Sequence, residues 1–175
     1  LSPNHPKKQY KLGAIFENRD RRVQAIKHFG LANQYDPSNY DWQFRYARLL
    51  DRHAQTVEDY NQHAGMAMEA YTATIQLKPY ASAYFFRGLL IRRYRQIGST
   101  LYLSSEAAND FEAVIEMEAD NAKAHYFLGL TYLDMDNRDM ARQYFVKALK
   151  IDPKYVGANL EIGLIEEWLQ NYRVA

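Results

Sequence analysis

Histidine is the residue of this sequence best suited to metal binding or to acid–base catalysis near neutral pH. The five histidines are His5, His28, His53, His63 and His125. No two of them lie four residues apart, the spacing that places two imidazoles on one helical face as metal ligands. His53 and His63 flank a segment in which they could meet, although we favour solvated surface histidines. Since the sequence also has no glycine-rich phosphate loop and no nucleophile elbow, it predicts no metal, no cofactor and no enzymatic activity.

Arginines gather in one stretch that contains no acid. This stretch, residues 82–105, carries Arg87, Arg92, Arg93 and Arg95, whereas residues 106–121 carry six acids and no base. We favour two antiparallel helices that neutralise each other along their solvated edges. The alternative is a site for nucleic acid or for an acidic partner on Arg87 to Arg95, but the nearby acids make a poor track for phosphates.

The composition sets few limits on function. The chain has 175 residues, a net charge of +1 and no cysteine, so neither nucleic acid nor an anionic membrane is the default partner. No apolar run approaches the roughly 20 residues of a membrane span, and both a cytoplasmic and a periplasmic location fit a soluble chain of this kind. Because the chain starts at Leu1 without a methionine, we expect a trimmed N-terminus, and a removed signal or anchor stays open.

One stretch, residues 121–155, carries the most regular pattern of small and large side chains. Its fixed points are Leu128, Gly129, Tyr132, Ala141, Phe145, Ala148 and Pro153. Gly129 lies one helical turn from Tyr132, and Ala141 lies four residues before Phe145, so each pair lines one face of a helix. The pattern predicts a helical hairpin, broken at residues 136–138, whose small residues let the two helices approach closely.

This pattern resembles the tetratricopeptide repeat (TPR), whose 34-residue signature has these residue types in this order. The resemblance implies an all-α, right-handed superhelical solenoid that forms a single domain over residues 1–175. We expect four hairpins, at about 6–39, 40–80, 81–121 and 122–155, followed by a capping helix over 156–175. Since the family binds proteins, the resemblance also implies a non-enzymatic adaptor that acts in the assembly of a larger complex.

The second and third copies are longer than the regular repeat, by eight and seven residues. Each excess is close to two turns of helix at 3.6 residues per turn. Longer helices would absorb it without rotating their buried faces. Protruding loops at residues 52–60 and 98–105 are the alternative, and the spacing alone favours neither.

The resemblance also implies which residues face a partner, because first helices line the concave groove of the family. The position three residues before the small residue of each first helix holds four aromatic residues and a leucine. With neighbouring positions, the predicted partner-binding set is Tyr10, Phe44, Arg48, Phe85, Leu89, Arg92, Tyr126, Leu130, Leu133, Leu160 and Leu164. Such a groove would hold an apolar or amphipathic segment of a partner protein. The alternative is that the aromatic side chains fill space between stacked repeats.

A second hypothesis assigns self-association to the last helix. Trp168 and Leu169 are more apolar than a capping helix requires. They could form the contact of a homodimer in a structural or assembly factor.

Overall fold

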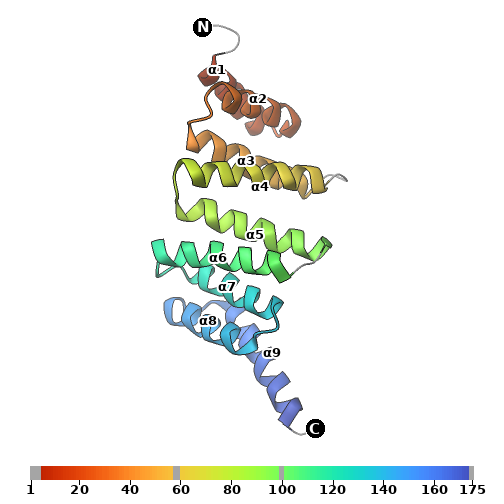
Figure 1. The fold of residues 1–175 in the computed structure, drawn as a ribbon, viewed down its shortest axis with the longest axis vertical. Helices are drawn as coiled ribbons and strands as arrows, with labels where there is room; N and C mark the ends of the chain where they lie inside the picture. Colours follow the sequence, from red (N-terminus) through yellow and green to blue (C-terminus); the bar gives the residue numbers. More distant parts are fainter. Residues whose placement is uncertain (1–4, 57–59, 99–100, 174–175) are drawn as a thin grey trace. The chain divides into compact units, whose positions relative to one another are not determined.

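The computed structural model describes residues 5–56, 60–98 and 101–173, and these residues form nine helices and no strand (Figure 1). The helices are α1 (Pro6–Asn18), α2 (Arg22–Tyr35), α3 (Tyr40–Ala54), α4 (Tyr60–Leu77), α5 (Ala81–Gly98), α6 (Leu101–Met117), α7 (Ala122–Asp134), α8 (Arg138–Ile151) and α9 (Val156–Arg173). Two helices fall in each predicted hairpin range, and α9 falls in the predicted capping range. None of the described helices is long and apolar enough to cross a membrane.

The extra residues of the second and third copies lie mainly in helices. Helices α3 and α4 have 15 and 18 residues, whereas α1 and α2 have 13 and 14. Helices α5 and α6 have 18 and 17 residues, whereas α7 and α8 have 13 and 14. The structure therefore favours the longer helices over the protruding loops, although residues 57–59 and 99–100 of those segments lie outside the described residues.

The chain separates into two compact units, Leu1–Leu90 and Ile91–Ala175. Each unit is described by itself below, and the single domain over residues 1–175 stays a prediction. Within unit 1, α1 packs on α2, α2 on α3, and α3 on α4. Within unit 2, α6 packs on α7, α7 on α8, and α8 on α9. The packed neighbours in each unit are consecutive in the chain.

The core of unit 1 begins where α1 and α2 approach each other. Ala25, Phe29 and Leu49 are buried together, and Tyr10 and Tyr46 pack against them from the edge. A Cβ atom added to Gly13 would lie 2.7 Å from the Phe29 ring, so the absence of a side chain there lets the ring reach the backbone of α1.

The core of unit 2 repeats this arrangement. One cluster of buried residues in this core consists of Ala141, Phe145, Ala148, Ala158 and Ile165. A Cβ atom added to Gly129 would lie 2.6 Å from the Phe145 ring, which confirms the close approach of α7 and α8 that the small residue predicts. By contrast, a Cβ atom added to Gly163, at the matching place of α9, would meet nothing within 4 Å.

Asparagine side chains begin three of the helices. Asn39, Asn121 and Asn137 each accept a hydrogen bond from a backbone N–H in the first turn of α3, α7 and α8, at 3.2, 3.0 and 3.1 Å. These bonds satisfy donors that a helix start leaves without an intrahelical partner. The α1–α2 turn and the α7–α8 turn each contain an aspartate with positive φ, Asp20 (55°) and Asp136 (59°).

Candidate binding surface

The predicted groove residue of α1, Tyr10, is half-buried among aromatic rings of unit 1. Its ring stacks on Trp42 of α3, with centroids 4.9 Å apart, and tilts against Phe29 of α2 at 5.3 Å. Arg45 of α3 donates a hydrogen bond of 3.0 Å to the Tyr10 hydroxyl. Tyr10 of α1 therefore packs against both α2 and α3. This is the alternative role that the sequence allowed for the aromatic residues, that of filling space between stacked repeats.

Phe44 and Phe85 belong to one group of half-buried rings in unit 1. The Phe44 ring lies 5.1 Å from Tyr80 and 6.1 Å from Phe86, and Phe85 lies 5.6 Å from Phe86. We call Phe44, Tyr80, Phe85 and Phe86 the α3–α5 aromatic cluster. The structure thus brings together two predicted site residues from the first helices of consecutive repeats.

A charged side chain covers part of this cluster. The guanidinium carbon of Arg48 lies 3.3 Å from the centroid of the Phe86 ring, which is a cation–π contact. Leu89, one turn beyond Phe85 on α5, is also half-buried. Burial, together with the nearby Asp41 carboxylate, raises the pKa of Tyr80, so its hydroxyl stays protonated and neutral.

In unit 2 the predicted site residues of α7 contact the following helices. The Tyr126 ring lies 5.7 Å from Phe145 and 4.9 Å from Tyr155, and its hydroxyl end lies 3.0 Å from where a Cβ of Gly157 would be. Leu130 and Leu133 pack on the buried cluster of α8 and α9. These three side chains are half-buried, so each contributes to packing inside unit 2.

Arg92 is engaged within unit 2. Its Nη2 lies 3.0 Å from Oδ2 of Asp134, and the two side chains are only 15% and 18% exposed. The Nε atom donates a second hydrogen bond to the same oxygen at 3.0 Å. Of the other arginines in the acid-free stretch, Arg87 donates to Thr72 at 3.1 Å, and the Arg95 side chain lies outside the described residues.

Helix α9 carries the most exposed of the predicted residues. Leu160 is 60% exposed and Leu164 is 51% exposed. Trp168 and Leu169 are instead half-buried: the guanidinium of Arg138 lies 4.1 Å from the Trp168 ring, and Leu169 packs on the unit 2 core. The apolar surface that α9 presents therefore lies on Leu160 and Leu164 more than on the pair predicted for self-association.

The structure brings His53 and His63 together, with ring centroids 4.8 Å apart. Burial, followed by the charges of His63 and Arg22, lowers the pKa of His53. No group of three histidine, aspartate or glutamate side chains in the described residues could hold a metal ion.

Sequence reasoning missed Trp42, Tyr80 and Phe86, which are aromatic neighbours of the predicted residues Tyr10, Phe44 and Phe85. All three are aromatic residues that do not occupy the repeated position from which the groove was predicted. The signal that could have found Phe86 is its place next to Phe85, and the signal for Tyr80 is its place at the entry to α5.

Comparison with known proteins supports the repeat assignment. Residues 122–155 match the family model described as tetratricopeptide repeat, and no curated protein sequence matches the chain. MamA 41-end from Desulfovibrio magneticus RS-1 is 15% identical, with a TM-score of 0.79 over 97% of this chain and 88% of that one.

Two further solved structures have the same fold. YrrB, described as a TPR protein with an unusual peptide-binding site, is 22% identical, with a TM-score of 0.74 over 90% of this chain and 74% of that one. PilF of Pseudomonas aeruginosa is 18% identical, with a TM-score of 0.71 over 95% of this chain and 70% of that one. These likenesses confirm the predicted all-α class of helical-repeat solenoids. Residues 122–155 therefore match a tetratricopeptide repeat, and the chain shares the fold of solved structures that include a TPR protein.

Proposed function

We propose that this chain is a protein–protein interaction adaptor that binds an apolar or amphipathic segment of a partner protein on its first helices. The observation that carries the proposal is the α3–α5 aromatic cluster, because it gathers half-buried rings from two first helices. Rings of this kind supply large contact area at low conformational cost and are enriched among the anchors of protein interfaces.

The neighbourhood of the cluster suits a peptide with mixed character. An apolar side chain of the partner would pack beside Phe44 and Phe85. Arg48 is held in place by its contact with Phe86, and the N–H groups at the edge of a stacked guanidinium can still donate to a carboxylate. The expected ligand is therefore an apolar segment with an acidic residue near its anchor.

Leu89 continues this surface along α5 within unit 1. In unit 2, the half-buried Leu130 and Leu133 of α7 are proposed as separate apolar contacts. YrrB, a protein of similar fold, has a peptide-binding site, and this supports the same use of the fold here.

The test begins with selection of displayed random peptides on the wild-type chain, followed by fluorescence-polarisation titration of the selected peptides. We expect apolar peptides that contain an acid, and we expect Phe85→Ala and Arg48→Ala each to weaken binding about tenfold, a typical loss at an interface anchor. The matched control is Tyr35→Ala, which removes an aromatic ring that is 41% exposed on α2. Failure to enrich any peptide, or an equal loss in the Tyr35 variant, would contradict the proposal.

A further inference from the structure

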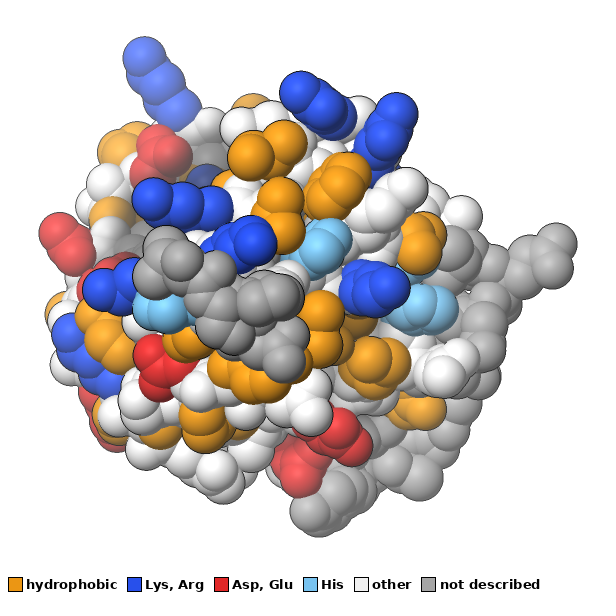
Figure 2. Space-filling model, turned by 90° about the horizontal axis from the view of Figure 1, so that it is seen from above, with side chains coloured by type: hydrophobic (Ala, Val, Ile, Leu, Met, Phe, Trp, Pro, Cys, Tyr) orange, Lys and Arg blue, Asp and Glu red, His pale blue; other side chains and the backbone are white. Residues whose placement is uncertain are grey.

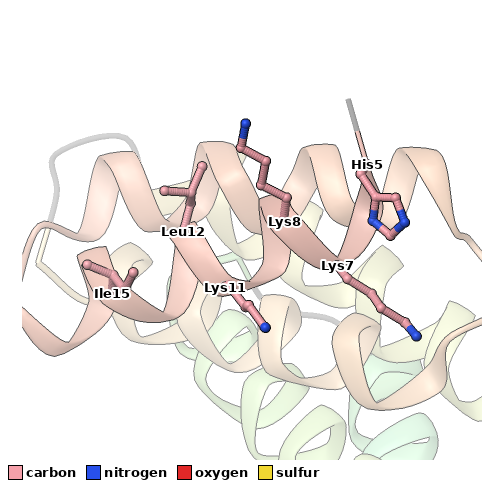
Figure 3. A pocket seen from close by; sticks show the side chains of 6 residues that line it. All are labelled: His5, Lys7, Lys8, Lys11, Leu12 and Ile15. Atoms are coloured by element: carbon pink, nitrogen blue, oxygen red, sulfur yellow. The ribbon is translucent and has the colours of Figure 1, made fainter. Parts of the chain in front are cut away.

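The outer side of α1 is a basic surface with apolar side chains at one end. His5, Lys7, Lys8, Lys11, Leu12 and Ile15 line an open pocket of about 450 Å³ (Figure 3). The three lysines are exposed, and Ile15 is 46% exposed although it is apolar. In Figure 3 the apolar pair lies toward one end of the pocket and His5 toward the other, with the lysines along its length. We call these six residues the α1 face.

The charge of the α1 face is not neutralised by its own helix. Glu17 is the one acid in the sequence of α1, and it pairs with Arg45 and Arg52 of α3 at 2.8 and 3.6 Å. In Figure 2, which is seen from above the view of Figure 1, several Lys and Arg side chains lie beside apolar ones. The Nδ1 atom of His5 is buried without a hydrogen-bond partner among the described residues. The α1 face therefore suits an apolar segment flanked by acids.

Helix α9 carries a surface of the opposite charge. Val156, Leu160 and Leu164 are 78%, 60% and 51% exposed, and their spacing of four residues puts them on one side of the helix. Glu167 continues this apolar row one turn later and Glu161 flanks it, whereas Glu166 pairs with Arg142 of α8 at 2.7 Å. We call Val156, Leu160, Glu161, Leu164 and Glu167 the α9 face.

The surface of α7 that matches the α9 face is covered by α8. At the matching places of α7, Tyr126 and Gly129 are covered by Phe145 of α8, whereas Gly163 of α9 has no neighbour within 4 Å of its Cβ position. The apolar row of α9 is therefore built like a packing surface, and none of the described residues covers it at Gly163.

We infer that the α1 face of one copy docks on the α9 face of a second copy. An apolar row with acids fits an apolar pocket with lysines, and both occur on the same chain, so a second copy is an occupant with the required chemistry. Since the two faces differ, the contact is heterologous and each copy keeps one free face, which lets association continue beyond a dimer. The inference does not rest on peptide binding at the α3–α5 aromatic cluster.

The contact is expected to be weak and sensitive to salt. Two single-helix faces bury less than the roughly 1,200 Å² of a standard interface. Charges at the rim are screened within a Debye length of about 8 Å at physiological ionic strength. Association should therefore become visible at high protein concentration and low salt.

Sedimentation velocity on two complementary variants tests this arrangement. One variant reverses the α1 face (Lys7→Glu, Lys8→Glu, Lys11→Glu), and the other removes the apolar row of the α9 face (Leu160→Ser, Leu164→Ser). The wild-type chain should form species larger than a dimer as its concentration rises. Each variant alone should be monomeric, whereas their equimolar mixture should stop at a dimer, because it contains one intact α9 face and one intact α1 face.

A second experiment reverses the charges of both faces within one variant. Adding Glu161→Lys and Glu167→Lys to the lysine-reversed variant should restore association to within about tenfold of the wild-type chain, because the attraction is re-formed with opposite signs. Circular dichroism checks that each variant is folded, as expected for substitutions of exposed side chains. A wild-type chain that stays monomeric up to about 1 mM at low salt, or a lysine-reversed variant that still dimerises alone, overturns the inference.

Discussion

Gly129 lies so close to Phe145 that a Cβ atom added to the glycine would meet the phenyl ring at 2.6 Å. Gly13 has the same relation to Phe29 in the first hairpin, at 2.7 Å. Both phenyl rings are fully buried, so neither can move aside without disturbing its other neighbours. The distance between the two helices of a hairpin is thus set by the absence of one side chain.

Replacing Gly129 by alanine should therefore destabilise unit 2. Overpacking costs about 1–3 kcal/mol and outweighs the gain of up to about 1 kcal/mol in helix propensity. Urea unfolding followed by circular dichroism measures the difference. Gly163→Ala is the matched control, because it makes the same change at the corresponding place of α9, where nothing lies within 4 Å. That control should stabilise the chain by about 0.5–1 kcal/mol, and a loss of stability in it would contradict this account.

The ion pair between Arg92 and Asp134 should contribute measurably to the stability of unit 2. Both side chains are largely buried, and two N–H groups of the arginine bond to one carboxylate oxygen at 3.0 Å. A double-mutant cycle with Arg92→Met and Asp134→Asn should give a coupling free energy of about 1–3 kcal/mol. If the stability losses of the two single variants simply add in the double variant, the ion pair contributes nothing to the stability of unit 2. Arg142 and Glu166, 2.7 Å apart but 48% and 45% exposed, provide a control cycle with a coupling below about 1 kcal/mol.

Tyr126→Ala and Phe85→Ala should separate packing from binding. Tyr126 contacts rings from α8 and from the segment before α9, so its truncation should lower the free energy of unfolding by about 2–4 kcal/mol. Phe85→Ala should cost about 1 kcal/mol, the value of a lost aromatic pair, while it weakens peptide binding. Equal losses of stability in the two variants would place Phe85 in the core rather than on the binding surface.

Acidification should destabilise the chain through His53. Its pKa in the folded chain lies below the ordinary value of 6.5, so the unfolded chain binds more protons as the pH falls below about 6.5. The contribution of His53 is therefore fully present above that pH and is lost as the pH falls toward its folded pKa. Urea midpoints between pH 7.5 and pH 5 should fall for the wild-type chain and fall less for His53→Gln. His28, whose pKa is also lowered by burial, accounts for part of the slope that remains.

Much of the fold can be predicted from the sequence, because a repeated spacing is a local property. The places of Gly13 and Gly129, and the break between α7 and α8, follow from the positions of small residues and of turns. The sequence does not predict whether the eight and seven extra residues of the second and third copies lengthen the helices or form loops. Both arrangements keep the same buried faces.

The binding surface is harder to predict than the helices. Family geometry places Tyr10, Phe44, Phe85 and Tyr126 at equivalent positions, yet each meets a different set of rings in the structure. Tyr10 is stacked on Trp42, and Tyr126 is packed toward Gly157. Such contacts depend on side chains from neighbouring helices, which no repeat pattern specifies. For the same reason, the sequence did not predict that Asp134 pairs with Arg92.

The packing of each helix on the next one in the chain also has a consequence for folding kinetics. In both units the packed helices are consecutive, so their contacts join residues close in sequence, and little loop entropy is lost before they form. Folding in the microsecond to millisecond range is expected, with nucleation in a regular hairpin such as α7–α8 and growth toward its neighbours. Stopped-flow refolding that took seconds would mean that contacts between distant parts of the chain limit the rate.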